Sequence, residues 1–187
     1  NTYTGPTTIL EGTLSANTTD ALGNGSATNT LILSGGTLQA AGTITSGATR
    51  AFTLSSNNST INTNGNSISV AGSFGGSGSL TKSGAGALTI TGTTTLGGDL
   101  TISAGTFAPT NVVVSGMGTL SIDGFTATGT MSMTKTGGTA TFEGDVGATT
   151  LTINGTGGTL NLGTALTHTF SGDVTLTAGT LDVGSST

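Results

Sequence analysis

The chain has 187 residues, of which only 6% are charged and 34 are glycine, and its formal net charge at pH 7 is −5. Ordinary globular domains carry about 25% charged residues, and such a bias is usually typical of disorder. The cations, Arg50, Lys82 and Lys135, are too few to bind a nucleic-acid backbone or an anionic membrane. Because cysteine is absent, neither a disulfide framework nor a thiolate metal site can form.

The placement of the apolar residues argues against disorder. Short runs in which apolar residues alternate with Thr or Ser recur along the chain, and disordered linkers lack such runs. In chain order, the predicted strands are residues 30–33, 67–70, 87–90, 119–122, 150–153, 159–162, 173–176 and 180–183. Glycine pairs and Asn-Gly or Asp-Gly steps between them predict tight corners. We expect the apolar side chains to stack inside and the Thr side chains to form rows outside.

Similar segments recur at regular distances. Residues 98–107 return almost unchanged as residues 172–181, 74 positions later, and the Thr-Lys-x-Gly segments of Lys82 and Lys135 are 53 positions apart. The Gly-Thr-Leu segment of Gly12 recurs at Gly36, 24 positions on. These distances are near three, two and one times about 25 residues, the length of one coil of a three-sided β-solenoid.

The sequence therefore predicts an all-β fold, a β-solenoid (β-helix) with about 25 residues and three strands per coil. Residues 1–187 are expected to form a single solenoid segment, with Leu14 and Leu38 stacked inward on adjacent coils. An antiparallel sandwich has many short strands as well, but it does not favour similar segments at multiples of one coil length. Because Asn1 is not an initiator residue, we expect the segment to be a fragment of a longer repeat protein. With no run of about 18 apolar residues, it is not expected to insert into a membrane.

Two stretches resemble the autotransporter-associated β-strand repeats of bacterial surface proteins. Residues 1–14, NTYTGPTTILEGTL, match the element N-T-Y-T-G-x-T-x(4)-G-x-L of that family, and residues 78–92, GSLTKSGAGALTITG, match L-T-K-x-G-x-G-x-L-x-L-x-G. In the family the second element runs into N-T-Y-T-G, whereas here residues 93–96, TTTL, follow. The resemblance implies a right-handed parallel β-helix in the surface-exposed passenger of a secreted bacterial protein, and it provides no catalytic residues to carry over.

An enzyme is the lesser alternative, because parallel β-helices include polysaccharide lyases and hydrolases. Their sites need clustered carboxylates with Arg or Lys on one face. Asp99 and Asp173 occupy equivalent places in the repeat, as do Lys82 and Lys135, so each pair is expected on one edge, about 10 to 15 Å apart. This is too far for a retaining carboxylate pair and at or beyond the inverting limit. We therefore expect no enzymatic activity and no catalytic or cofactor-binding residues.

Metal sites are not expected either. Residues 75–80, GGSGSL, begin like the calcium-binding pattern G-G-x-G-x-D but end in Leu80 where the carboxylate should be. His168 has no second histidine with which to share a metal, so we expect it to fill or edge a strand.

The function expected from these observations is structural: an extracellular surface stalk or adhesin passenger segment. The alternative is a subunit of an extracellular filament or sheath assembled by end-to-end stacking of solenoids. The expected partners are neighbouring coils or like subunits end to end, and a host or matrix surface. A stalk continues covalently into further coils, whereas a filament subunit pairs its end coils with other molecules.

Overall fold

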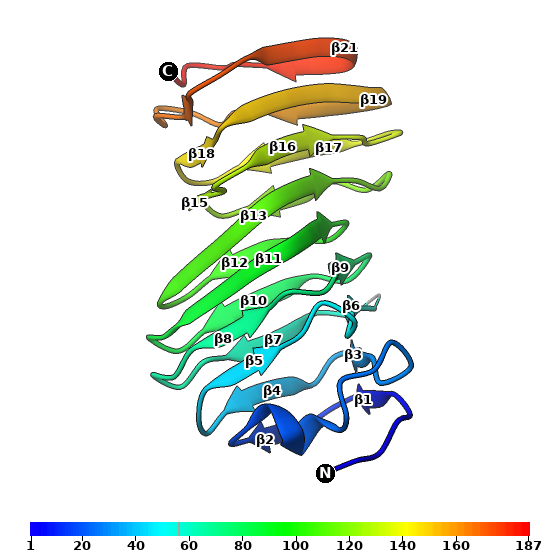
Figure 1. Ribbon diagram of the computed structural model, residues 1–187. Helices are drawn as coiled ribbons and strands as arrows, with labels where there is room; N and C mark the ends of the chain where they lie inside the picture. The colour runs from blue at the N-terminus through cyan, green and yellow to red at the C-terminus, as the bar shows by residue number, and fades with distance from the viewer. Residues whose placement is uncertain (56) are drawn as a thin grey trace.

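Parallel strands wind into a β-solenoid of about 8 turns, which are about 21 residues apart (Figure 1). This computed structural model describes residues 1–55 and 57–187. The turns stack from the N-terminus at one end of the rod to the C-terminus at the other. A short 3-10 helix, η1 (Thr19–Leu22), stands in the first coil where later coils have their third strand. The predicted all-β solenoid is confirmed.

Each later coil contributes one strand to each of three walls, so three strands per coil are confirmed. Wall A contains β1 (Thr7–Ile9), β3 (Leu31–Leu33), β6 (Phe52–Leu54), β9 (Phe74–Gly76), the second halves of β11 (Ala87–Leu96) and β13 (Thr106–Val114), β16 (Thr130–Met133), and the first halves of β19 (Thr150–Asn161) and β21 (Val174–Asp182).

Wall B contains β2 (Thr13–Ala16), β4 (Thr37–Ala40), β7 (Ser59–Asn62), β10 (Leu80–Ser83), β12 (Leu100–Ile102), β14 (Leu120–Ile122), β17 (Thr139–Phe142) and the second halves of β19 and β21. Wall C contains β5 (Ile44–Ser46), β8 (Ile68–Val70), the first halves of β11 and β13, and then β15 (Phe125–Thr126), β18 (Val146–Ala148) and β20 (Thr169–Phe170). The last three form a separate three-stranded sheet.

Most coils are shorter than the predicted length of about 25 residues, which the structure corrects to about 21. Leu14 pairs with Leu38, 24 positions later, but Leu80 pairs with Leu100, 20 positions later. The first coil is long because it includes η1 and the wide corner that follows it. Later corners are tight turns built on glycine, and they need fewer residues.

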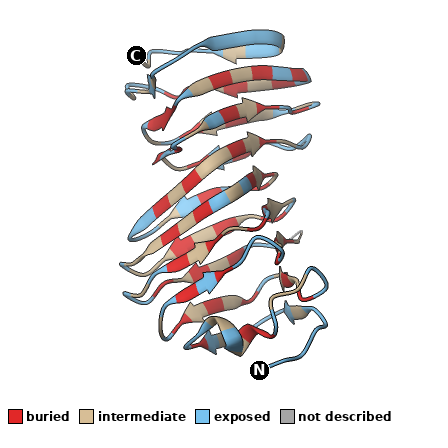
Figure 2. Cartoon of the chain, in the orientation of Figure 1, coloured by how far each residue is buried: buried red, intermediate tan, exposed pale blue. Residues whose placement is uncertain are grey.

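The core is a set of side-chain ladders inside the three walls. Leu14 stacks on Leu38, as predicted, and the same column continues through Ile61. Leu38 and Ile61 are fully buried, whereas Leu14, in the first coil, is partly buried against the core. Figure 2 shows buried and more exposed residues alternating along the strands of every inner coil. This alternation is the period of two on which the predicted strands rest, and each fully buried Leu or Ile contributes about 1.5–3 kcal/mol.

Threonines form the expected rows on the outside. On wall B, one unbroken row crosses the first five coils, and its members pair in register: Thr13, Thr37, Thr60, Thr81 and Thr101. A β-branched side chain fits the pleated outer surface of a parallel wall well. The rod therefore presents hydroxyl and methyl groups, with few charges, to its surroundings.

Candidate functional site

All three cations of the chain are buried. Lys82 and Lys135 are 0% exposed and Arg50 is 1% exposed. A buried charge is costly unless hydrogen bonds replace its water. Here these bonds come mostly from backbone carbonyl groups at the corners of the solenoid, although Nε and Nη1 of Arg50 have no partner among the described residues. The charged group of each cation lies at a different corner: that of Arg50 between walls C and A, that of Lys82 between walls B and C, and that of Lys135 between walls A and B.

Lys82 ties three successive coils together. Its Nζ donates to the hydroxyl of Thr63 at 3.1 Å, to the carbonyls of Ser83 and Gly84 at 2.9 and 2.8 Å, and to the carbonyl of Ala104 at 2.9 Å. Thr63 follows β7, Ser83 ends β10, and Ala104 follows β12, so the acceptors belong to the preceding, the same and the following coil. Lys82 thus serves as an internal latch across the B–C corner.

Arg50 and Lys135 each connect two coils. Nη2 of Arg50 donates to the carbonyl of Gly23 at 3.1 Å and to Oδ1 of Asn29 at 2.5 Å. Nζ of Lys135 donates to the carbonyl of Gly118 at 2.6 Å. Removal from water lowers the pKa of Arg50, Lys82 and Lys135 below the ordinary values of these side chains.

The burial of the three cations was not predicted from the sequence, although the alternation of apolar and polar residues contained the signal for the two lysines. Lys82 lies two positions after the buried Leu80, and Lys135 lies two positions after the buried Met133. Since alternate residues of a strand point to the same side, both lysines have the parity of the core. Lys82 in fact continues the column of Leu38 and Ile61 and pairs with Ile102 on its other side.

The expected equivalence of the repeated charged pairs is wrong. Lys82 lies in β10 on wall B, whereas Lys135 follows β16 on wall A; Asp99 precedes β12 on wall B, whereas Asp173 precedes the wall A half of β21. Neither pair lies on one edge. Each copy of the sequence repeat instead forms a strand, a corner and the following strand. The two copies form this unit at two different corners of the solenoid.

Two glycines show how one sequence unit can serve two corners. Gly105, in the first copy of the ten-residue repeat, lies between walls B and C, and Gly179, in the second copy, lies between walls A and B. Their φ values are +75° and +93°. Glycine adopts this left-handed region at no steric cost, so the same unit makes the turn wherever it occurs along the coil.

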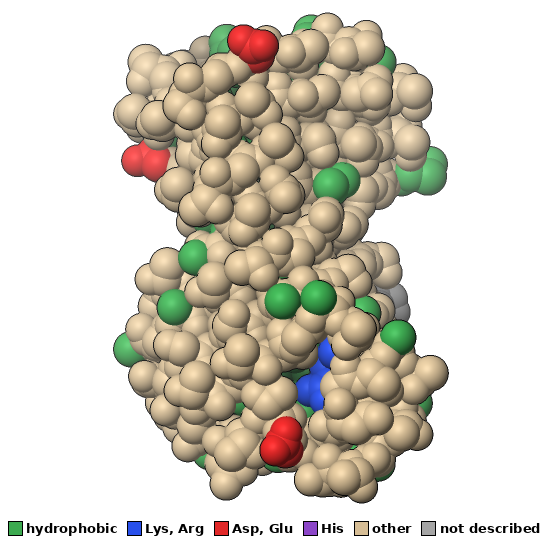
Figure 3. Space-filling view, viewed as in Figure 1, with side chains coloured by type: hydrophobic (Ala, Val, Ile, Leu, Met, Phe, Trp, Pro, Cys, Tyr) green, Lys and Arg blue, Asp and Glu red, His purple; other side chains and the backbone are tan. Residues whose placement is uncertain are grey.

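The carboxylates, in contrast to the cations, lie at the surface. Seven are exposed and Asp123 is half-buried; the set is Glu11, Asp20, Asp99, Asp123, Glu143, Asp145, Asp173 and Asp182. Asp99, Asp123 and Asp145 accept backbone N–H groups of adjacent coils, from Ser121, Ile102 and Thr167 at 2.8, 2.6 and 2.8 Å. With every Lys and Arg buried, the accessible side-chain charge is negative. Figure 3 shows scattered acidic side chains on one face of the molecule and basic atoms at the bottom of a recess in its lower half.

His168 and the glycine-rich segment have structural roles. Nδ1 of His168 accepts the N–H of Val146 at 3.1 Å, Nε2 lies 2.7 Å from the carbonyl of Leu162, and the ring packs on Phe142 at 5.4 Å between centroids. Both ring nitrogens therefore have protein partners. Leu80, at the position where a calcium-binding repeat would need a carboxylate, is a core residue. Across residues 1–55 and 57–187, no group of three His, Asp or Glu side chains is placed to hold a metal.

A hollow lies on wall C near the C-terminal end. It has a volume of about 430 Å³, and its floor is β18 at Gly147, between Thr126 of β15 and Thr169 of β20. Asp145 lies at its edge. No helix in the described part of the chain has the length and apolar character needed to cross a membrane.

Comparisons with known proteins agree with the resemblance noted from the sequence. Residues 1–16 and 80–108 match the family model of the passenger-associated-transport-repeat. The adhesin BmaC autotransporter of Brucella suis biovar 1 (strain 1330) is 39% identical over 113 residues, covering 56% of this chain and 3% of that protein. The chain thus spans a small part of the length of its curated relative. No solved structure matches it. The predicted relation to autotransporter passenger repeats is confirmed.

Proposed function

We propose that this chain, which carries passenger-associated transport repeats, is a surface-exposed segment of a bacterial autotransporter passenger and serves there as a non-enzymatic stalk or adhesin segment. The observation that carries the proposal is that both segments matched by the family model lie within the strands of the stacked coils. The matched residues 1–16 form β1 and β2, and the matched residues 80–108 run from β10 into the wall C half of β13. Both matched segments are thus parts of the stacked coils that form the rod.

The fold suits a spacer that holds other parts of a protein away from a cell. About 8 turns with a rise of about 4.8 Å each make a rod roughly 40 Å long. A continuous core and cation latches at the corners join adjacent coils, and such a rod resists bending better than a flexible linker of the same composition. The neutral, hydroxyl-rich and weakly acidic surface supports an extracellular location.

Antibody labelling of the producing bacterium tests the location. Antibodies raised against this segment should label intact cells, and permeabilisation should not increase the signal. An antibody against a cytoplasmic protein should label permeabilised cells alone. Labelling of the segment that requires permeabilisation would refute surface exposure.

Assembly of like segments end to end is a second candidate, because apolar side chains are exposed at both ends of the rod. Leu10 in the first coil is 66% exposed, and Val174 and Leu176 in the last coil are 50% and 55% exposed. Terminal coils also leave strand N–H and C=O groups free for pairing with another chain. Head-to-tail contacts of this kind need not close, so the expected product is a filament rather than a dimer.

Light scattering at increasing protein concentration distinguishes the two uses. A filament subunit should grow in mean mass with concentration, and Leu176→Lys should reverse the growth. Met117→Lys is the control, because Met117 is 74% exposed but lies in a corner away from the ends of the rod. A segment that stays monomeric at high concentration would exclude the filament and leave the stalk.

A further inference from the structure

On wall B, the pairing between coils is reduced to a single position halfway along the rod. On wall B, β12 and β14 pair at one position, Leu100 with Ile122. The junctions on either side are regular: β10 pairs with β12 at three positions, and β14 pairs with β17 at three. Leu100 and Ile122 are 22 positions apart, whereas the flanking pairs are 20 apart, so the first residue of β12 faces the last residue of β14 and the two strands overlap at this position alone.

Wall C is interrupted at the same junction. The first half of β13 pairs with β11 below it, but the next strand of this wall, β15, belongs to the separate sheet of β15, β18 and β20. Outside the gap lies a hollow of about 390 Å³, whose lining includes Ile102, Thr106 and Gly124. Figure 3 shows that the molecule narrows at mid-height. We call this junction, between the coil of β12 and the coil of β14, the waist.

Wall A is continuous across the waist. Residues 93–96 of β11 pair with residues 111–114 of β13, and β13 pairs in turn with β16. The N–H of Ser115 donates to the carbonyl of Leu96 at 2.9 Å, so the ladder extends to the corner. On wall A a continuous ladder of backbone hydrogen bonds thus joins the two halves of the rod. On walls B and C few backbone hydrogen bonds cross the waist.

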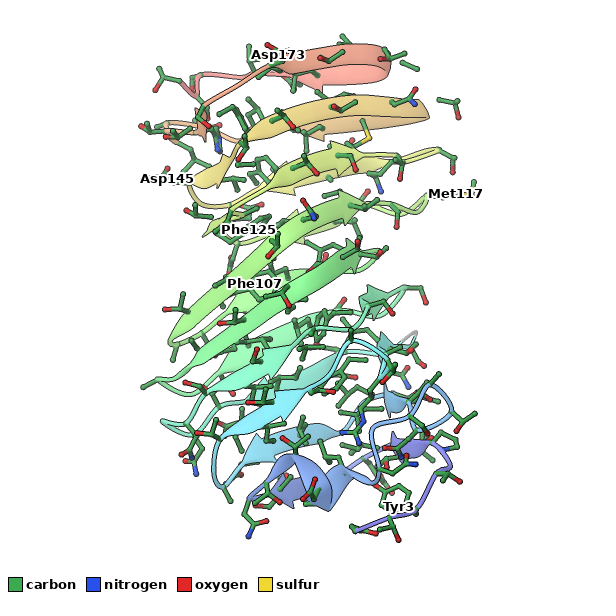
Figure 4. The ribbon with its side chains drawn as sticks, viewed as in Figure 1. Tyr3, Phe107, Met117, Phe125, Asp145 and Asp173 are labelled. Carbon is green, nitrogen blue, oxygen red and sulfur yellow. The ribbon has the colours of Figure 1, made fainter. Side chains whose placement is uncertain are left out.

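Side chains replace the missing ladder. Asp99 Oδ1 accepts the N–H of Ser121 at 2.8 Å from across the waist, and Asp123 Oδ2 accepts the N–H of Ile102 at 2.6 Å in the opposite direction. On wall C, the rings of Phe107 and Phe125 meet edge to face, with 5.8 Å between their centroids (Figure 4). Side-chain bonds of this kind can break and reform by rotation about single bonds, and apolar contacts are not directional, so both tolerate movement that a strand ladder does not.

We propose that the waist is a hinge, at which the rod bends by opening on walls B and C about an axis along wall A. Asp99 and Asp123 form a reciprocal latch that closes it, and Phe107 and Phe125 are the apolar contact that separates when it opens. The coils before and after the waist move as two rigid blocks. In a surface stalk, such a hinge would allow the rod to yield under lateral force without the loss of either block.

Amide hydrogen exchange resolved by NMR tests the hinge in the intact chain. The amides of Ile102 and Ser121 should exchange at least about tenfold faster than those of Leu80 and Glu143, which bridge the flanking junctions to Asp99 and Ile122. The amide of Ser115, at the waist but on wall A, should be protected like the flanking amides. Equal exchange at Ile102, Ser121, Leu80 and Glu143 would overturn the proposal, and so would a Ser115 amide as fast as that of Ser121.

A latch variant separates concerted opening from a local loss of bonds. Asp99→Ala with Asp123→Ala should speed exchange severalfold at Thr128, whose N–H donates to the Pro109 carbonyl on the far side of the waist at 3.2 Å. Asp173→Ala, which changes an exposed carboxylate in the last coil, should leave Thr128 unaffected. An unchanged Thr128 rate in the double variant would show that the carboxylates do not close a hinge.

Discussion

The ammonium group of Lys82 lies 3.1 Å from the hydroxyl of Thr63, although Thr63 belongs to the preceding coil. The same ammonium reaches the carbonyl of Ala104 in the following coil at 2.9 Å. In a solenoid each coil contacts its neighbours alone, so stability depends on the interface between successive coils. A side chain that binds three coils at once acts on two of these interfaces.

Replacement of Lys82 should therefore be costly. In Lys82→Met the hydrocarbon chain is largely preserved, but the carbonyls of Gly84 and Ala104 lose their buried donor. An unsatisfied buried polar group costs about 1–3 kcal/mol, and we expect a loss of this size in the free energy of unfolding by urea. Asp173→Asn is the control and should be neutral within about 0.5 kcal/mol. If Lys82→Met were as stable as the control, the hydrogen bonds of Lys82 would not stabilise the stack of coils.

The buried lysines should also make stability depend on alkaline pH. Burial lowers the pKa of Lys82 and Lys135 below 10.5, so between the lowered values and 10.5 the unfolded chain binds more protons than the folded chain. The free energy of unfolding therefore increases with pH across this window, and the two lysines destabilise the fold most at pH values below the window. Urea unfolding from pH 7 to 10.5 should show the rise, and Lys82→Met with Lys135→Met should flatten it. A parallel profile in the double variant would contradict this origin.

Two leucines give a matched test of the core. Leu38 is fully buried in the wall B column, whereas Leu10 is 66% exposed in the first coil. Leu38→Asp places an unpaired charge in the core and should cost several kcal/mol, enough to disrupt folding of the segment. Leu10→Asp should change the melting temperature little. Circular dichroism during thermal unfolding distinguishes them, and similar melting of both variants would mean that Leu38 has been misplaced.

Folding should be independent of calcium. The glycine-rich segment that begins at Gly75 ends in the buried Leu80 rather than in a carboxylate. Treatment with EDTA should leave the β-sheet signal in circular dichroism and the melting temperature unchanged, and added Ca²⁺ should not restore or raise them. A loss of β-structure on chelation would show that a metal site exists elsewhere in the chain.

The strands could be predicted from the sequence because the solenoid gives each of them the same environment. Alternating residues with an apolar inside and a Thr or Ser outside are enough to mark them, and all eight predicted runs lie in strands or overlap them. The coil length could be predicted less well. The distances of 74 and 53 positions join segments on different walls, so they do not span whole coils. The distance of 24 positions, from Gly12 to Gly36, spans the long coil with η1, whereas the corners of later coils are tighter.

The placement of charged residues could not be read from the repeats. Similar segments reflect how the chain turns a corner, and Lys82 and Lys135 turn different ones. To assign a residue to a wall, the lengths of all coils between it and a reference residue must be known. Over 53 or 74 positions, errors of a few residues per coil add up to the length of one strand and its corner, which moves the residue to another wall. The alternation of apolar and polar residues could have predicted that the lysines are buried. However, cations seldom occupy core positions, and the composition does not indicate that they do so here.

The stack of parallel coils is tested most directly by one distance between two spin labels. The chain has no cysteine, so Thr13→Cys with Thr101→Cys allows both labels to be attached without other changes. Both residues are exposed on wall B and are joined by the row of paired threonines four coils long. Pulsed electron paramagnetic resonance should give a narrow distribution centred at about 20 Å, four times the spacing of about 4.8 Å between strands. A broad distribution, or a distance beyond about 35 Å, would contradict the solenoid.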